Sequence, residues 1–462
     1  MVFSSAIFLW LFLPIVFGMN YLITIIDKKY SNFFLVVASL IFYAWGEPRF
    51  VVLMLISIFI NWFVGKLIDR GGQKRAALLI GIAINLLILG YYKYAKFFVQ
   101  IINSISNRQV VPEPNVELPI GISFFTFQAL SYLIDVYRGN TKAQNNLVNL
   151  ALYISFFPQL IAGPIVKYKD INEQIENRII TGDRIAEGFR RFVYGLSKKV
   201  LVSNVLALGV DTIFSMNIDC ISGITAWIGA ILYTFQIYYD FSGYSDMAIG
   251  LGKMFGFDFL ENFNYPYLSC SIREFWRRWH ISLSTWFKQY VYIPLGGNRK
   301  GRIRTYVNLF IVFFLTGLWH GASYNFILWG LFHGFFSIIE RPCEKLLNKS
   351  KILSWIYTFF VINIGWVLFR IENVRDAARI IKRMLLPWRY CVSSQSIGML
   401  MDLRMILMLV CAVFGMGIIQ KLPQLKKLKF SLLEACYCLL LFLLSISFIA
   451  GGTYNPFIYF RF

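Results

Sequence analysis

Residues 1–26 read MVFSSAIFLWLFLPIVFGMNYLITII, a run without a single charged side chain. About 20 mainly apolar residues are enough for a helix to cross the hydrocarbon core of a membrane. The run lacks a basic segment at its start and an A-x-A-like cleavage site, and it is too long for the apolar core of a signal peptide. It therefore predicts a retained first transmembrane helix.

The rest of the chain repeats this pattern. Of the 462 residues, 58% are hydrophobic and only 15% are charged, whereas a soluble protein of this length needs more polar surface. We therefore predict an all-α, polytopic transmembrane bundle of about 11 to 13 crossings, with re-entrant or amphipathic helices besides. No internal repeat or linker divides the chain, so we expect one integral membrane domain over residues 1–462. The expected crossings are residues 3–26, 31–45, 49–68, 76–92, 118–137, 146–163, 188–214, 223–240, 305–320, 322–340, 352–370, 402–420 and 430–450.

The net charge of +21 resides mostly in short segments between apolar runs. Residues 27–29 (DKK) and 66–75 (KLIDRGGQKR) are basic, whereas the loop 46–49 (GEPR) is not, which places the N-terminus outside and the two basic loops in the cytoplasm. A nucleic-acid-binding protein would gather its cations on one soluble face, so we expect no nucleic-acid partner. The pattern indicates a multi-pass protein of the bacterial inner membrane, in contact with lipid.

Two stretches do not fit a simple crossing. Residues 167–187 (KYKDINEQIENRIITGDRIAE) are polar and helix-forming, which predicts an amphipathic helix on the membrane surface. Residues 257–304 mix aromatic residues, glycines, prolines and arginines without a clean apolar run. A long irregular stretch within a compact protein is more often functional than idle, so this segment is a candidate for the site.

The chain contains three histidines, and each is informative because an ionisable residue at membrane depth is costly. His320 lies in LTGLWHGASYNFILWG, where two apolar segments meet. A neutral imidazole there can take a proton from an attacking hydroxyl, or it can be a core histidine that bonds a neighbouring helix. His333, in WGLFHGFFSIIER, has large apolar neighbours and is expected to pack between helices.

The third histidine, His280, lies in the basic, tryptophan-rich segment REFWRRWHISLSTWFKQYVYIPLGGNRKGR. Guanidinium groups pair with phosphates and an aromatic face stacks on a purine, so this mixture suits coenzyme A. The alternative is a positive-inside anchor with a belt of interfacial tryptophans. The candidate donor-binding residues are Arg273, Arg277, Arg278, Arg299, Trp276 and Trp279.

Other polar residues in the apolar segments are expected to orient or support the site. They are Asp240 and Asp246 in YYDFSGYSDMAIGLG, and Asn325 just after His320. The seven cysteines form no CxxC pair and no cysteine–histidine zinc spacing, so we expect neither disulfides nor a metal. No nucleophile elbow, phosphate-binding loop or HExxH motif is present.

Together these motifs resemble the alginate O-acetylase branch of the membrane-bound O-acyltransferase family. The resemblance covers nearly the whole chain. It rests on FWRRWHISLSTWFKQYVYIPLGGNR (275–299) and GLWHGASYNFILWGLFHG (317–334), with YYDFSGYSDMAIGLG (238–252) before both. It extends to the N-terminal run, to LPIGISFFTFQALSYLIDVYRG (118–139), to FFPQLIAGPIV (156–166) and to the closing FIYFRF (457–462).

The resemblance implies a helical bundle whose thin central region is reached from both faces of the membrane. His320 matches the family's invariant histidine and becomes the expected catalytic base, while His280 matches the earlier conserved histidine, near the donor. The implied donor is cytoplasmic acetyl-CoA, with no permanently bound cofactor. The implied recipient is an extracytoplasmic partner of the SGNH or alginate-acetylation type, which O-acetylates an exported polysaccharide or cell-wall polymer resembling alginate, cellulose or peptidoglycan.

The aromatic tail has two interpretations. By likeness to the tail that a small partner supplies in D-alanylation systems, Tyr459 becomes a candidate acyl relay. The alternative is an interfacial aromatic anchor. For the whole chain, the alternatives are a D-alanyl or other acyltransferase, or a transport or polysaccharide-export component without catalysis, since intramembrane charges and broken helices also suit a substrate path.

Overall fold

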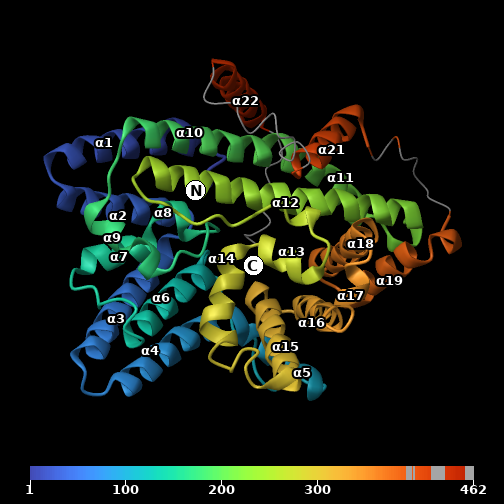
Figure 1. Ribbon diagram of the computed structural model, residues 1–462, viewed down its shortest axis with the longest axis horizontal. Helices are drawn as coiled ribbons and strands as arrows, with labels where there is room; N and C mark the ends of the chain where they lie inside the picture. Colours follow the sequence, from blue (N-terminus) through green and yellow to red (C-terminus); the bar gives the residue numbers. More distant parts are fainter. Residues whose placement is uncertain (392–397, 399–400, 418–431, 453–462) are drawn as a thin grey trace. The chain divides into compact units, whose positions relative to one another are not determined.

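The computed structural model describes residues 1–391, 398, 401–417 and 432–452, and all regular structure within these ranges is helical (Figure 1). The chain divides into two compact units. Unit 1 comprises residues 1–192 and 245–260, and unit 2 comprises residues 193–244 and 261–462. The helices α10 (Gly182–Ser197) and α12 (Gly223–Met254) contribute residues to both units. The expectation of one membrane domain stays a prediction.

The described residues contain seven helical runs that are long and apolar enough to cross a membrane, fewer than the predicted number of crossings. These runs are Phe8–Ile26, Pro48–Arg70, Lys74–Ile105, Gly182–Ser215, Gly301–His320, Lys351–Arg370 and Leu432–Ala450. Shorter apolar helices cover Lys29–Ala44, Tyr324–Ile339 and Leu403–Gly415, where crossings were also expected. Large apolar side chains on the outside, such as Ile25 (70% exposed) and Ile303 (80% exposed), suit contact with lipid rather than water.

Two expected crossings differ from the helices observed. The segment predicted over residues 146–163 breaks at Phe156, whose ψ of 115° ends one helix before Pro158 enters the first turn of the next. The segment predicted over residues 223–240 instead continues as α12 to Met254, through two aspartates. The sequence signal failed there because charged residues and glycines are typical of a helix end.

Unit 1 is built from antiparallel helices, of which α3, α4 and α6 pack against one another (Figure 1). Most of α6 is buried, and Gly65 on α3 allows its close approach, since a Cβ there would lie 2.5 Å from the hydroxyl oxygen of Tyr132. Besides parts of α10 and α12, the elements are η1 (Phe8–Phe12), α1 (Leu13–Ile26), α2 (Lys28–Ala44), η2 (Pro48–Phe50), α3 (Val51–Arg70), α4 (Lys74–Leu89), η3 (Gly90–Tyr94), α5 (Ala95–Ile105), α6 (Ile122–Tyr137), α7 (Leu147–Ser155), α8 (Phe157–Leu160) and α9 (Tyr168–Asn177).

The polar stretch 167–187 forms a helix only in part. Helix α9 buries Tyr168, Ile171 and Ile175, which lie on one face because they are spaced three and four residues apart. The chain then leaves the helix after Asn177, and α10 begins at Gly182. The amphipathic character of α9 agrees with the prediction, whereas the single helix across the whole stretch was wrong.

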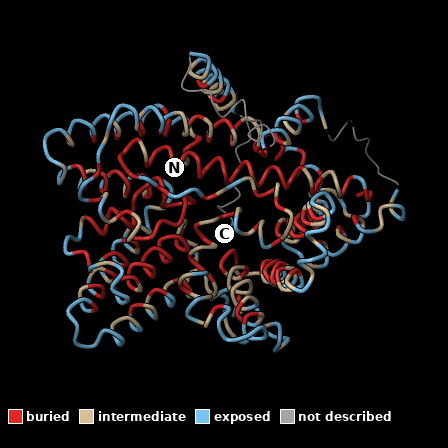
Figure 2. Tube along the Cα trace, in the orientation of Figure 1, coloured by how far each residue is buried: buried red, intermediate tan, exposed pale blue. Residues whose placement is uncertain are grey.

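Unit 2 contains the segment that carries the three histidines. Besides parts of α10 and α12, its elements are η4 (Lys198–Ser203), α11 (Asn204–Ser215), η5 (Ile218–Cys220), η6 (Pro266–Leu268), α13 (Ile272–Arg278), α14 (Ile281–Phe287), η7 (Lys288–Tyr292), α15 (Gly301–His320), α16 (Tyr324–Ile339), α17 (Glu344–Leu347), α18 (Lys351–Arg370), α19 (Val374–Leu385), η8 (Pro387–Arg389), α21 (Leu403–Gly415) and α22 (Leu432–Ala450). Figure 2 shows that α12 is buried along most of its length.

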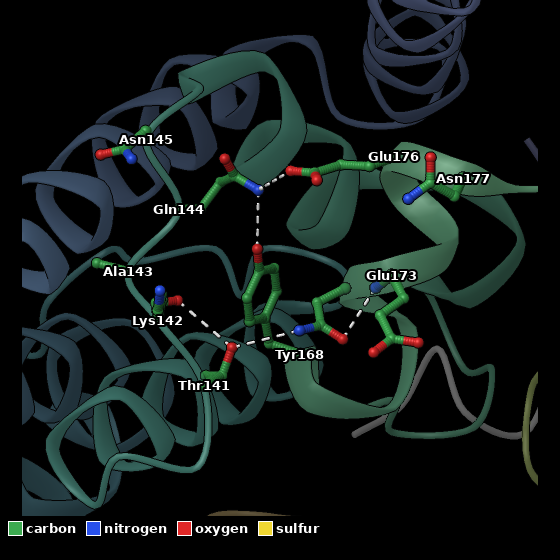
Figure 3. Close-up of a pocket in the computed structure, with 10 residues that line it drawn as sticks. Thr141, Lys142, Ala143, Gln144, Asn145, Tyr168, Glu173, Glu176 and Asn177 are labelled. Atoms are coloured by element: carbon green, nitrogen blue, oxygen red, sulfur yellow. Dashed lines mark hydrogen bonds between the residues drawn. The ribbon is translucent and has the colours of Figure 1, made fainter.

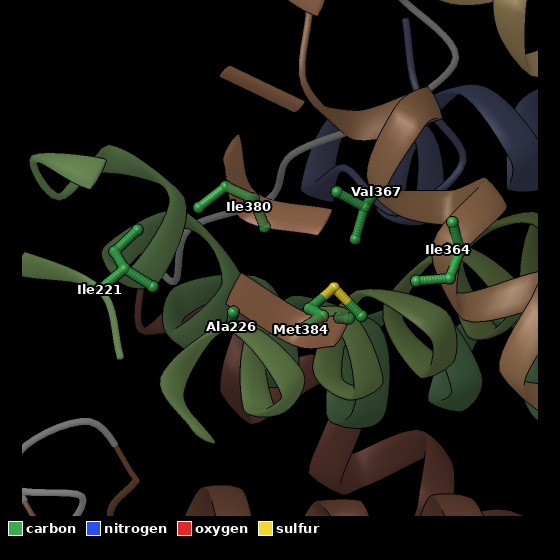
Figure 4. Packing of buried hydrophobic residues seen from close by; sticks show 7 residues of the cluster. Ile221, Ala226, Ile364, Val367, Ile380 and Met384 are labelled. Atoms are coloured by element: carbon green, nitrogen blue, oxygen red, sulfur yellow. The ribbon is translucent and has the colours of Figure 1, made fainter. Parts of the chain in front are cut away.

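A cluster of buried apolar side chains joins α12, α18 and α19 (Figure 4). It comprises Ile221, Ala226, Ala230, Ile364, Val367, Ile380 and Met384. Helix α19 presents Ile380 and Met384 to the cluster, and the indole N–H of Trp227 donates to the Met384 carbonyl at 2.9 Å. Burial of this cluster holds the short amphipathic helix α19 against the much longer helices α12 and α18.

Helices α15 and α16 form a tight hairpin that positions His320 at its turn. Their close approach depends on small residues, as is common between membrane helices. A Cβ on Gly317 would overlap the carbonyl oxygen of Phe326, and a Cβ on Gly330 would overlap that of Phe313. The short connection through residues 321–323 then leaves His320 as the last residue of α15.

The hairpin packing predicts a stability effect at Gly317. We expect Gly317→Ala to lower the free energy of unfolding by about 1 to 3 kcal/mol, because the added methyl group must displace backbone. Chemical denaturation of the purified protein in detergent measures the change. Gly18→Ala is the matched control, since no neighbouring atom lies within 4 Å of a Cβ at that helical position. Equal stability of Gly317→Ala and the parent protein would contradict the close packing.

Candidate functional site

His320 is buried among aromatic rings at the C-terminal end of α15. Only 4% of the His320 surface is exposed. The imidazole centroid lies 4.9 Å from that of Trp329, 5.1 Å from that of Phe369 and 5.0 Å from that of its neighbour Trp319. These rings come from α15, α16 and α18, so three helices together limit the orientations of the imidazole. Rings on several sides also restrict the approach of water to the imidazole.

His280 lies directly before α14 and is 1% exposed. Its backbone is left-handed, with φ 45° and ψ 56°, a conformation that is uncommon for residues other than glycine. Its Nδ1 lies 3.1 Å from the side-chain oxygen of Asn262. Burial lowers the pKa of His280 to about 3, so the ring is neutral at physiological pH.

Trp319 connects the two histidines that the sequence singled out as catalytic. Its ring centroid lies 6.0 Å from that of His280 and 5.0 Å from that of His320. The loop before α14 and the end of α15 therefore bring both imidazoles to one tryptophan, although forty residues of chain separate them (320 − 280 = 40). The two candidate catalytic residues thus share one aromatic neighbour.

His333 is buried on α16, the second helix of the hairpin. Its ring centroid lies 5.0 Å from that of Trp276 and 5.1 Å from that of Trp329. Gly365 on α18 faces its Nε2 so closely that a Cβ at residue 365 would overlap the ring. These contacts join α13, α16 and α18, as expected for a histidine that packs between helices.

The arginines of the predicted donor site mostly point outward. Arg278 forms an ion pair with Glu274 at 2.8 Å, and Arg273 lies 3.8 Å from Glu344. Arg277 is exposed and forms no ion pair within the described ranges. Three cations thus lie along the short helix α13, where an anionic ligand could reach them.

Arg299 and the two tryptophans lie apart from this row of arginines. Arg299 is exposed in the turn after η7, and no contact described for it reaches α13. Trp279 is only 2% exposed and lies between Phe275 and Trp366, at centroid distances of 5.5 and 4.8 Å. Trp276 packs against Trp329 at 5.4 Å. The structure therefore separates the predicted donor residues into outward arginines and inward tryptophans.

The polar residues expected to orient the site all contact a neighbouring element. Asp240 forms a buried ion pair with Lys199 at 2.5 Å, and Asp246 pairs with Arg191 at 2.5 Å. Asn325, at the start of α16, accepts from the hydroxyl of Ser323 and donates to the carbonyl of Leu368 at 3.4 Å. Lys199 and Asn262 were not predicted from the sequence, although a lysine within the apolar run 188–214 is a signal that could have indicated Lys199. Tyr459 lies outside the described residues.

Unit 1 has a polar pocket of about 360 Å³ between the loop 141–145 and α9 (Figure 3). Gln144 donates to the hydroxyl of Tyr168 at 2.9 Å and to Glu176 at 3.4 Å. Asn172 donates to the hydroxyl of Thr141 at 3.4 Å. These bonds tie the loop to the helix within the pocket, and none of the predicted site residues lines it.

Comparisons with known proteins agree with the resemblance found in the sequence. Residues 139–371 match the model of the membrane-bound O-acyltransferase family. The protein named probable alginate O-acetylase in Pseudomonas putida is 42% identical over the whole of both chains. The peptidoglycan O-acetyltransferase of Helicobacter pylori is 37% identical over 83% of this chain and 80% of its own. The teichoic acid D-alanyltransferase of Bacillus subtilis is 29% identical over 56% of this chain and 70% of its own.

The family, the helical class and the multi-pass membrane character predicted from the sequence are thus confirmed. The matched region begins at the end of α6 and includes the site around Trp319 and all of α18. It therefore contains all three histidines and the arginines of α13. The chain belongs to the membrane-bound O-acyltransferase family, and it is an O-acyltransferase of the bacterial cytoplasmic membrane.

Proposed function

We propose that this O-acyltransferase takes an acetyl group from cytoplasmic acetyl-CoA and passes it across the membrane, for O-acetylation of an exported polysaccharide. The full-length likeness to a probable alginate O-acetylase and the likeness to a peptidoglycan O-acetyltransferase support the acetyl group and the polymer. The observation that carries the proposal is the pair of buried histidines that both contact Trp319.

His320 acts as the general base in this proposal. The acceptor hydroxyl attacks the carbonyl carbon of the thioester while the imidazole takes the hydroxyl proton. The new C–O bond forms, the C–S bond breaks, and the proton passes from the imidazolium to the thiolate of coenzyme A. The aromatic walls around His320 assist by keeping out water, which would otherwise compete as the acceptor.

The arginines of α13 bind the donor in this proposal, through its phosphates. Arg277 is exposed, and Arg278 is held by Glu274 with part of its guanidinium open to solvent. Acetyl-CoA is a substrate here and is released as coenzyme A after each transfer. Because Trp279 is buried, the adenine of coenzyme A stacks on another residue in this proposal.

Neutralising the two central arginines tests this donor site. We expect Arg277→Gln together with Arg278→Gln to raise the KM for acetyl-CoA about 30-fold, because two charge-assisted contacts to phosphate contribute roughly 1 kcal/mol each and about 1.4 kcal/mol corresponds to a tenfold change. Steady-state release of coenzyme A measures the KM. Arg375→Gln together with Arg379→Gln, on α19, is the matched control, and its KM should stay at the parent value. An unchanged KM in the α13 variant would favour a simple positive-inside anchor.

The acceptor side involves an extracytoplasmic partner in this proposal. The partner would be an SGNH-type or alginate-acetylation-type acetyltransferase, which receives the acetyl group and modifies alginate, cellulose or peptidoglycan. Tyr459 remains the proposed acyl relay to this partner.

A second candidate function is transfer of D-alanine, since a teichoic acid D-alanyltransferase is also similar over about half of the chain. A panel of donors separates the two candidates: acetyl-CoA, longer acyl-CoA thioesters and D-alanyl carrier thioesters. We expect the purified protein to cleave acetyl-CoA with the highest kcat/KM. Preference for the D-alanyl thioester would overturn the proposed acetyl transfer.

A further inference from the structure

Asn262 contacts His280 from a loop eighteen residues earlier in the chain (280 − 262 = 18). Asn262 is 1% exposed, and it accepts hydrogen bonds from the first two backbone N–H groups of α14. The backbone N–H of Ile281 donates to its backbone oxygen at 2.9 Å, and the backbone N–H of Ser282 donates to its side-chain oxygen at 3.2 Å. These are two of the free amides that every helix leaves at its start. His280, the residue at the capping position, supplies no such bond itself.

The bond from the Ser282 amide fixes which atom of the Asn262 side chain faces the helix. A backbone N–H can only donate, so the side-chain atom opposite it must be the oxygen and not the amide nitrogen. The hydroxyl of Ser282 donates to the same oxygen at 2.9 Å. The orientation of the Asn262 amide is therefore determined by its partners.

The oriented oxygen in turn fixes the tautomer of His280. Nδ1 lies 3.1 Å from this oxygen, which only accepts hydrogen bonds. The hydroxyl oxygen of Ser282 lies 3.4 Å from Nδ1, but its hydrogen is directed to Asn262, so towards Nδ1 it acts as an acceptor. Both neighbours of Nδ1 therefore place the proton on Nδ1. In a neutral imidazole the other nitrogen then holds a lone pair. Nε2 is buried and has no hydrogen-bond partner in the described part of the chain. The ring is held from the side by Phe241, at a centroid distance of 4.6 Å, and by Trp319.

The backbone of His280 adds an independent sign of function. A left-handed conformation at a residue other than glycine costs about 1 kcal/mol or more, and such residues cluster at active sites. The bonds from Asn262 to Ile281 and Ser282 on the following turn hold the chain in this conformation. Asn262 thus positions both the backbone and the ring of His280.

We propose that Asn262 is a positioning residue that holds His280 in the Nδ1–H tautomer, so that the Nε2 lone pair receives a hydrogen bond from a substrate or from the acceptor group in the acyl-transfer site. This role rests on the proposed function. It assigns His280 as a hydrogen-bond acceptor at Nε2 and excludes it as a donor to the thioester carbonyl oxygen. Asn262 itself does not touch the reacting atoms.

The tautomer is measured directly by nitrogen NMR of the full-length protein labelled with ¹⁵N-histidine, reconstituted in lipid. Only three histidines contribute, and His280→Gln identifies the signals of residue 280. We expect a protonated, pyrrole-type Nδ1 and an unprotonated, pyridine-type Nε2. Ser282→Ala should keep the same tautomer, because the bond from Nδ1 to Asn262 remains. A protonated Nε2 in the parent protein would overturn the proposal, whatever the activity.

Kinetics of two Asn262 variants test the functional consequence. Asn262→Leu removes the oxygen that holds Nδ1, and we expect kcat for acyl transfer to fall about 10- to 100-fold with little change in the donor KM. Asn262→Asp keeps an accepting oxygen at the same place, so it should restore most of kcat and the parent tautomer. Equal losses of kcat in both variants, with the tautomer unchanged, would reduce Asn262 to a structural cap and contradict the proposal. A parent protein with the expected tautomer but no acyl transfer would refute the proposed function and leave the tautomer assignment standing.

Discussion

Replacing His320 with alanine is expected to lower the rate of acyl transfer by about 10²- to 10⁴-fold, the usual contribution of a general base. The imidazole is held by rings from three helices, and no other histidine can take its place because the remaining two are fixed by their own contacts. Release of coenzyme A from acetyl-CoA by the purified variant measures the loss. The donor KM should change little, since the base acts in the transition state.

His333→Asn is the matched control for this experiment. His333 is also buried and lies on the same hairpin, yet its contacts with Trp276 and Gly365 are those of packing. We expect the control variant to lose thermal stability and to keep its rate of transfer per folded molecule. A folded His320→Ala variant with the parent rate would remove His320 from the catalytic site.

The second large effect is expected at the buried ion pair between Lys199 and Asp240. Both side chains are almost inaccessible, at 2% and 0% exposed, and their charged atoms lie 2.5 Å apart. Asp240→Asn removes the carboxylate of a buried ion pair, and breaking such a pair on one side typically destabilises a protein by about 3 to 5 kcal/mol. We therefore expect a marked fall in the free energy of unfolding, measured by denaturant titration in detergent.

Two further variants test whether the loss of stability comes from breaking the buried ion pair. Lys199→Met in combination with Asp240→Asn removes the stranded charge and should recover much of the lost stability. Asp219→Asn makes the same chemical change at an exposed carboxylate, which pairs with Arg379 and Arg383, and it should cost about 0 to 1 kcal/mol. Additive losses in the double variant would show that Lys199 and Asp240 do not depend on each other.

Much of the fold and the family could be predicted because the features that reveal them are short stretches of continuous sequence. Apolar runs of membrane length define most helices, and the motifs around His280 and His320 are long enough to indicate the family. The length of α12 could not be predicted, because Asp240 and Asp246 look like a helix end when read alone. Their cations, Lys199 and Arg191, are far away in the sequence, and only the packed structure shows that the charges are compensated.

The candidate site shows the same limit. The sequence motifs indicated His280 and His320, and the structure buries both beside aromatic residues. The prediction that Trp279 and the nearby arginines face the same ligand does not agree with the structure. In the structure Trp279 is in the core while Arg277 is exposed, because neighbouring residues of a short helix point to different sides. Asn262 was missed because an asparagine in a loop has no sequence pattern that reveals its partner.

The proposed transmembrane acetyl transfer can be measured as movement of a labelled acetyl group across a sealed bilayer. The protein is reconstituted in proteoliposomes, labelled acetyl-CoA is supplied at the cytoplasmic face, and a purified extracytoplasmic partner or polysaccharide is supplied at the other. We predict that label appears on the acceptor at the opposite face, in step with release of coenzyme A, and that His320→Ala lowers both by about 10²- to 10⁴-fold. Label that never leaves the donor, or an equal yield from the His320→Ala variant, would contradict the account.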